Sequence, residues 1–192
     1  MSVFNDSDIQ QECETNNMVS PFIPENLQPA SIDVTLAPTL KWFKRQDWND
    51  HNVPPLNIRE GEYENGDDRF EGEIITTGTE INDHYILPPN AFALASTVET
   101  FKIPLDVQAQ VAGKSSLARL GLAVHVTAGF IDPAFNGQIT LELKNMNNVH
   151  GIVLYPNMVI AQVSFMTLTE PAVHPYDGHY QNQVGTTESR FI

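Results

Sequence analysis

The stretch QITLELKN, residues 138–145, alternates apolar and polar side chains with a period of two. This period places successive side chains on opposite faces of an extended chain, so the stretch is predicted to be a β-strand with one apolar face. Glu142 lies on the opposite, polar face. On an antiparallel sheet such an acid is most simply a solvent-facing residue. A carboxylate held on a rigid strand also suits general-base chemistry.

The sequence around this strand has the same character from residue 85 onward. Short runs rich in Val, Ile, Phe and Thr are separated by Pro, Gly and Asn, which is typical of an all-β barrel or sandwich. The alternation Ile32–Val34–Leu36 predicts a further strand, and the acidic residues 44–73 are expected to form a loop or an exposed hairpin. The chain has no internal repeat or linker, so residues 1–192 are predicted to form one mainly β domain.

Two short segments are expected to be helical. Residues 6–16 (DSDIQQECETN) form a predicted helix that is capped by Asp6 or Ser7 and has Ile9 and Cys13 on one face. The segment SSLARLGL, which begins at residue 115, fits a single helical turn.

The formal net charge of −14 is unevenly distributed. Residues 1–100 contain 5 Lys and Arg against 18 Asp and Glu, whereas residues 101–192 contain 5 against 6. A protein that binds duplex nucleic acid needs a cluster of cations to displace counterions, and the sequence contains none. Nucleic-acid binding is therefore not expected.

The single cysteine, Cys13, excludes two further classes of protein. One thiol cannot build an internal disulfide framework, nor can it supply the His/Cys/Cys zinc site that zinc-dependent nucleobase deaminases use. The N-terminal residues are acidic and lack an apolar run, so no signal peptide is predicted. No apolar stretch is long enough to span a membrane. We therefore expect a cytoplasmic protein without membrane contact.

The segment AGKSSLARLGL (112–122) contains residues that suit a ligand site. Gly113 allows close backbone approach, the serines offer hydroxyl groups, and Lys114 and Arg119 supply cations. The simpler interpretation is a turn whose serines cap a short helix. The segment is not a Walker A loop, because Gln108 stands where that motif requires glycine.

Two other segments give weaker signals. Asp132 in TAGFIDPAFNG (127–137) lies between two glycines and is either a turn residue or a ligand for a hydroxyl group. The tail GTTESR, residues 185–190, offers amides, hydroxyls and Arg190 to a phosphate chain, or it is simply a frayed terminus.

Taken together and in this order, these segments resemble the dCTP deaminase branch of the dUTPase superfamily. The resemblance covers nearly the whole chain and is carried by residues 26–36, 113–145, 156–165 and 174–190. It implies a distorted, jelly-roll-like β-barrel with a few short helices, assembled as a homotrimer with active sites at the subunit interfaces. It also implies zinc-independent chemistry and a C-terminal lid at residues 175–192.

The resemblance also implies roles for individual residues. Glu142 would be the general base, Ser115 and Arg119 of an adjacent subunit would hold the water, and the backbone around Ala128 would complete the pocket. Asp132 would bind the 3′-hydroxyl of the deoxyribose. The residues implied to contact the nucleotide are Lys114, Ser115, Ser116, Leu117, Ala118, Arg119, Asp132, Thr140, Leu141, Glu142, Gln162, Tyr176 and Gln183.

Gly129 and Phe130 resemble the pattern of the bifunctional branch, which converts dCTP to dUMP, ammonia and pyrophosphate. Asp132 would then also orient water for attack on the α-phosphorus, with Mg²⁺ held mainly by the phosphates. The resemblance further implies thymidine triphosphate as a feedback inhibitor. The alternatives are a deaminase that releases dUTP, a plain dUTPase, a non-catalytic trimer that senses a nucleotide, and a structural β trimer.

Overall fold

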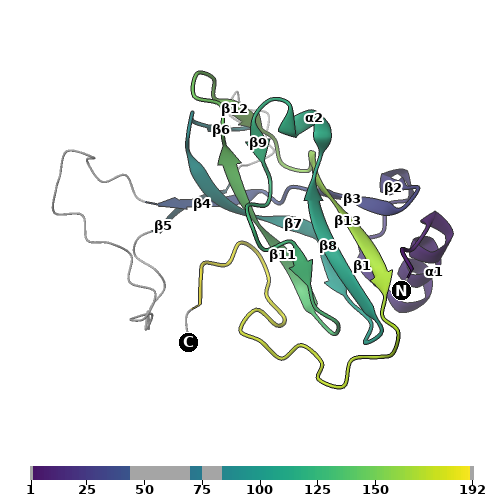
Figure 1. The fold of residues 1–192 in the computed structure, drawn as a ribbon. Coiled ribbons are helices and arrows are strands. Elements are labelled where there is room, and N and C mark those ends of the chain that lie inside the picture. Colours follow the sequence, from purple (N-terminus) through teal and green to yellow (C-terminus); the bar gives the residue numbers. More distant parts are fainter. Residues whose placement is uncertain (1, 44–69, 75–83, 191–192) are drawn as a thin grey trace.

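The computed structural model describes residues 2–43, 70–74 and 84–190. Two antiparallel sheets that share one apolar core form the body of this structure (Figure 1). The prediction of a mainly β fold is confirmed. The described strands form open sheets and do not close into a barrel.

The first sheet has the strand order β5-β4-β7-β11-β9, and β1 pairs with the far end of β7. Its strands are β1 (Val19–Ser20), β4 (Thr39–Phe43), β5 (Phe70–Ile74), β7 (Phe92–Lys102), β9 (Leu122–Ala123) and β11 (Asn136–Asn145).

The second sheet has the order β10-β8-β13-β3-β2, and a separate two-stranded sheet pairs β12 with β6. These strands are β2 (Leu27–Gln28), β3 (Ser31–Thr35), β6 (Tyr85–Leu87), β8 (Val107–Gly113), β10 (Phe130–Ile131), β12 (Ile152–Leu154) and β13 (Val159–Thr167). The helices are α1 (Asp6–Asn16), the 3₁₀ turn η1 (Pro24–Asn26) and α2 (Ser115–Ala118).

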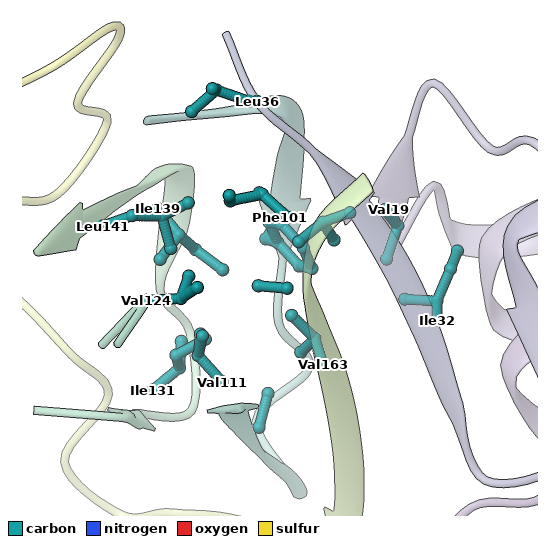
Figure 2. Packing of buried hydrophobic residues seen from close by; sticks show 14 of the residues in the cluster. Val19, Ile32, Leu36, Phe101, Val111, Val124, Ile131, Ile139, Leu141 and Val163 are labelled. Atoms are coloured by element: carbon teal, nitrogen blue, oxygen red, sulfur yellow. The ribbon is translucent and has the colours of Figure 1, made fainter. Parts of the chain in front are cut away.

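Strand β11 bears out the predicted alternation. Ile139, Leu141 and Leu143 are buried, whereas the residues between them are half-buried. Figure 2 shows Ile139 and Leu141 in the same cluster as Val111 of β8 and Val163 of β13. Burying one such aliphatic side chain stabilises a fold by about 1.5–3 kcal/mol. The core therefore fixes which face of β11 is left for function.

The pairing between β7 and β11 contains a bulge. Gln138 lies opposite Thr100, but Thr140 lies opposite Ser96, so three residues of β7 (97–99) lie opposite the single residue Ile139 of β11. Within the bulge, the hydroxyl of Thr97 accepts a hydrogen bond from the Ile139 amide at 3.0 Å. Bulges of this kind leave some backbone groups without their usual ladder partners.

Helix α1 has the predicted bounds but a different cap. Asn5 caps the helix, because its side chain accepts from the Asp8 amide while the Asp8 carboxylate accepts from the Asn5 amide. Neither Asp6 nor Ser7 is the N-cap, since both lie inside the first turn. Ile9 and Cys13 are buried on one face as predicted. Burial is the main cause that raises the pKa of the Cys13 thiol to about 11.

Two other predictions concern loops. The expected loop or hairpin at 44–73 lies mostly outside the described residues, although 70–73 belong to β5 and pair with β4. Residues 175–190, here called the C-terminal arm, correspond to the described part of the predicted lid. Residues 168–174 connect β13 to the arm, which runs back past β11 (Figure 1).

Candidate active site

The polar face of β11 carries Thr140 and Glu142 between the core residues Ile139, Leu141 and Leu143. The structure thus places Glu142 on the face that the alternation predicts. Its side chain remains 29% exposed. Because the opposite face of the strand is packed in the core, the backbone at Glu142 has little freedom to move.

His125 lies beside Glu142, on the segment that follows β9. Its Nδ1 atom is 2.9 Å from Glu142 Oε2, and only 8% of its side chain is exposed. This is an ion-pair distance, although the ring N–H is not aligned with the oxygen as in a regular hydrogen bond. The interaction with the Glu142 carboxylate raises the pKa of His125 above its ordinary value, while burial opposes this rise and the backbone of Ala128 adds to it.

The strand register explains why these two side chains meet. β9 and β11 are antiparallel, with Ala123 opposite Lys144. Continuing that register by two residues brings His125 opposite Glu142. Sequence reasoning missed His125, because a single histidine in an apolar run carries no signal until this register is known.

Gly129 packs against the His125 ring. A Cβ atom at this position would lie 2.9 Å from the carbonyl oxygen of Val111 and 3.3 Å from Cδ2 of His125. The first distance is shorter than real Cβ contacts allow. The lack of a side chain therefore allows the β8 backbone and the imidazole to approach together.

Several side chains on or beside β11 contain buried polar atoms without a hydrogen-bond partner in the described part of the chain. They are His125 Nδ1 and Nε2, Thr140 Oγ1, Glu142 Oε2 and Gln183 Oε1, of which His125 Nδ1 and Glu142 Oε2 face each other at ion-pair distance. Buried polar groups in folded proteins nearly always have a partner. This face of β11 therefore presents donors and acceptors that a bound ligand could satisfy.

The predicted water-holding residues lie on another surface. Ser115, Ser116, Leu117 and Ala118 form α2, and Arg119 is its C-cap. Apart from the half-buried Leu117, these side chains are exposed. Within the described chain, Glu142 forms no hydrogen bond or ion pair with Ser115 or Arg119. One copy of the chain thus does not assemble the full predicted set.

Lys114 is already paired within the chain. Its Nζ atom lies 2.7 Å from Oδ1 of Asp33, a buried residue that also accepts a hydrogen bond from Gln28 at 3.3 Å. Gln162 on β13 lies opposite Asp33 in the strand register. The positive charge of Lys114, which is predicted to contact the nucleotide, is therefore largely balanced by Asp33.

The turn around β10 carries four other predicted residues. Ala128, Phe130 and Asp132 are exposed, with Phe130 at 64%. Gly129 accepts a backbone hydrogen bond from Val111, which ties this segment to β8. The carboxylate of Asp132 forms no hydrogen bond with any described residue and is free to meet a ligand.

The C-terminal arm brings the two predicted lid residues to the body of the protein. The Tyr176 amide donates to Pro133, and its ring meets Phe135 edge-on with 5.8 Å between ring centroids. Gln183 is buried, with 7% of the residue exposed, against the start of β11. Arg190 donates to the carbonyl of His179 at 2.7 Å.

In the described ranges, no three His, Cys, Asp or Glu side chains are placed to hold a metal ion. No helix of the described residues is long and apolar enough to cross a membrane.

Comparison with known proteins adds sequence evidence to this geometry. A family model described as dCTP deaminase-like matches residues 3–168. A protein of Corynebacterium kroppenstedtii named "dCTP deaminase, dUMP-forming" is 39% identical over 98% of this chain and 96% of its own length. A protein of Halobacterium salinarum with the same name is 42% identical over 85% of this chain and 80% of its own length.

A solved structure has a similar fold. The 2′-deoxycytidine 5′-triphosphate deaminase of Agrobacterium tumefaciens superposes with a TM-score of 0.63 at 17% sequence identity. The match covers 86% of this chain, which spans about half (48%) of that protein's chain. At this identity the similarity is evidence for the fold alone.

Proposed function

The chain belongs to the dCTP deaminase-like family, and from this premise we propose that it converts dCTP to dUMP, ammonia and pyrophosphate. The observation that carries the proposal is Glu142, a partly exposed carboxylate on a rigid strand beside the buried His125. The names of relatives at 39% and 42% identity support the dUMP-forming outcome. The enzyme would work in the cytoplasm, where deoxynucleoside triphosphates are made and used.

Deamination replaces the 4-amino group of cytosine with oxygen. The oxygen of a water molecule bonds to C4, the bond between C4 and the amino nitrogen breaks, and ammonia leaves. Glu142 accepts a proton from the attacking water and delivers it to ring N3 as the double bond between N3 and C4 opens. The second proton then passes from the new hydroxyl group through Glu142 to the amino nitrogen, so that ammonia leaves and the C4 carbonyl forms. General acid–base catalysis of this kind typically contributes about 10²–10⁴ in rate, so positioning and charge stabilisation supply the remainder.

The neighbours of Glu142 position the reacting groups. His125 restricts the orientation of the carboxylate through their 2.9 Å approach. The main chain of Thr140–Glu142 reads the pyrimidine edge, and the backbone near Ala128 closes the pocket around C4. The unpartnered Thr140 hydroxyl supports a ligand on this side of β11.

A second subunit completes the site in this proposal. Ser115 and Arg119 of that subunit hold the attacking water and orient Glu142. The exposure of α2 and the lack of contacts from these residues to Glu142 in one chain support such a shared site. The assembly is a homotrimer, and thymidine triphosphate is its feedback inhibitor.

In the second step a water oxygen bonds to the α-phosphorus, the bond from this phosphorus to the oxygen that bridges to the β-phosphate breaks, and pyrophosphate leaves. Asp132 binds the deoxyribose 3′-hydroxyl and orients the water that attacks, while Gly129 and Phe130 shape the backbone beside it. Asp33 is occupied by Lys114 and Gln28, and the described chain offers no three-ligand metal set. We therefore assign Mg²⁺ to the nucleotide phosphates.

The proposal is tested by incubating the protein with dCTP and Mg²⁺ and resolving dUTP, dUMP, pyrophosphate and ammonia. We expect equal amounts of dUMP, ammonia and pyrophosphate. Accumulation of dUTP with ammonia would support deamination but overturn the dUMP-forming step. Turnover of dUTP without turnover of dCTP would indicate a dUTPase. A nucleotide-dependent shift of the melting temperature without turnover would indicate a sensing module. If nucleotide neither shifted the melting temperature nor was turned over, a structural trimer would be indicated.

A further inference from the structure

The side chain of Gln138 connects three segments that are far apart in the sequence. Its Nε2 atom donates to the carbonyl oxygens of Thr97 at 3.0 Å and Val98 at 3.1 Å, both in the β7 bulge. Its Oε1 atom accepts a hydrogen bond from the amide of Gly185 in the C-terminal arm. Turning the amide over would pair donors with donors and acceptors with acceptors, so its surroundings fix its orientation.

The bulge explains why this contact is available. Residues 97–99 have no ladder partners on β11, because the β7–β11 register slips between Gln138 and Thr140. Unpaired carbonyl groups in a bulge need other donors. The NH2 group of the Gln138 side chain supplies two donors from the neighbouring strand. Its Oε1 atom remains as the acceptor for the arm.

The backbone of the arm docks at the same place. The Gln138 amide donates to the Gln183 carbonyl at 3.0 Å, and Gln183 Nε2 donates back to the Gln138 carbonyl at 2.6 Å. Gly137 has a φ of +144°, and a Cβ there would lie 2.9 Å from the Gln183 carbonyl oxygen. The start of β11 is therefore shaped to accept residues 183–185.

The docked arm leaves the side-chain oxygen of Gln183 available to a ligand. The residue is buried, yet its Oε1 atom has no partner in the described part of the chain. Residues farther along the arm contact β4: Thr186 donates to the Thr39 carbonyl at 2.9 Å, and Glu188 pairs with Lys41. Asn136 also joins the arm to β11, because it hydrogen-bonds with Gln181 and Asn182. The Gln138 side chain is the contact that connects the arm to the β7 bulge as well as to the strand that carries Glu142.

We propose that Gln138 is a positioning residue: its carboxamide fastens the C-terminal arm to the β7 bulge and so holds Gln183 in place before the nucleotide binds. The inference rests on the proposed function, because Gln183 is assigned there to the nucleotide site. Gln138 acts through Gln183 and need not touch the substrate.

The test compares Gln138→Met, which keeps the side-chain length but removes every side-chain hydrogen bond, with wild type. Gln108→Met is the matched control, because the buried Gln108 donates only to Ala109 of its own strand. Hydrogen exchange at the Gly185 amide is measured without nucleotide, and KM and kcat are measured with dCTP. We expect Gly185 exchange and KM each to rise about tenfold in Gln138→Met, the factor that 1.4 kcal/mol represents, with kcat nearly unchanged.

A second variant, Gln138→Glu, has nearly the same volume and serves if Gln138→Met does not fold. Its ionised carboxylate would face the Thr97 and Val98 carbonyls, so the Gly185 amide should lose protection at neutral pH. Protection should return as acid protonates the introduced carboxyl group, which can then donate. A purely structural role of the position would not give this pH dependence.

The outcomes separate the inference from the proposed function. Wild-type protection of Gly185 and wild-type KM in Gln138→Met would overturn the role of Gln138 while leaving deamination intact. A fall in kcat with the arm still protected would also overturn it. If wild type does not deaminate dCTP but the exchange changes as expected, the fastening of the arm stands and the proposed function fails.

Discussion

At the scale of single residues, the site depends on the close contact between the side chains of His125 and Glu142. The imidazole is almost fully buried and reaches the carboxylate within 2.9 Å. Gly129 makes room for the ring, since any side chain there would meet the Val111 carbonyl. A buried histidine of this kind couples protonation to the stability of the fold.

The pH dependence of stability tests this pair. The Glu142 interaction raises the pKa of His125 above its ordinary value of about 6.5. The pair therefore contributes fully to the free energy of unfolding below about pH 6.5. The contribution is lost as pH rises through the raised pKa. His125→Gln should therefore lower the free energy of unfolding by about 1 kcal/mol at about pH 6 and by less at about pH 9.

Urea unfolding across this pH range measures the effect, and the exposed His174→Gln is the matched control. An equal loss of stability at both ends of the range would contradict the coupling between His125 and Glu142.

At the scale of elements, Glu99 joins the two sheets. This buried residue of β7 accepts hydrogen bonds from the Thr35 amide at 2.9 Å and the Thr35 hydroxyl at 2.8 Å on β3. Burial is the largest cause that raises the pKa of Glu99, and the bonds from Thr35 oppose it. The carboxyl group is thus most favourable to the fold when it is protonated.

Removing this link should destabilise the whole domain. Glu99→Ala leaves the Thr35 amide unpartnered, and we expect a loss of about 1–3 kcal/mol in the free energy of unfolding. Because the pKa of Glu99 is raised, its contribution to stability is present at low pH and declines as the pH rises through that pKa. The loss in Glu99→Ala should therefore be larger at about pH 4 than at about pH 8. Denaturant unfolding checks both points, with the exposed Glu170→Ala as control; a smaller loss at the lower pH would refute the assignment.

The junction of β11 with the arm gives a second element-scale prediction. Gly137→Ala combines an unfavourable positive φ with a clash against Gln183, so it should cost roughly 1–3 kcal/mol and release the arm. Gly113→Ala is the control, because its Cβ would make an ordinary 3.5 Å contact with Val124. Hydrogen exchange of residues 183–186 measures the release, and unchanged protection in Gly137→Ala would show that the arm docks independently of β11.

At the scale of the whole molecule, the proposed trimer predicts complementation between two inactive variants. Arg119→Ala and Glu142→Gln each remove one residue of a site that two subunits share. Refolding the two proteins together should restore activity at sites that combine an intact Arg119 with an intact Glu142. Mixtures that stay as inactive as the single variants would place both residues in one subunit.

Much of this architecture could be predicted from the sequence. The alternation of residues 138–145 predicted a strand with an apolar face, and it placed Glu142 on the polar side. Helix α1 was predicted with its bounds, but Asn5, Asp6 and Ser7 are all good capping residues, so local sequence could not choose among them.

The remaining features depend on contacts between distant segments. His125 meets Glu142 through the β9–β11 register, which no local pattern reports. Gln138 meets Gly185 because the arm docks beside β11, and the carbonyl groups of the β7 bulge orient its amide. The pairing of Lys114 with Asp33 likewise requires β3 and β8 to lie on either side of β13.

The most direct test of the central claim is ammonia release from dCTP by Glu142→Gln, with Glu170→Gln as the surface control. The amide keeps the size of the side chain but cannot accept the proton of the water, so ammonia release should fall about 10²–10⁴-fold while dCTP still raises the melting temperature. Wild-type ammonia release by Glu142→Gln would contradict the role of this carboxylate as the general base.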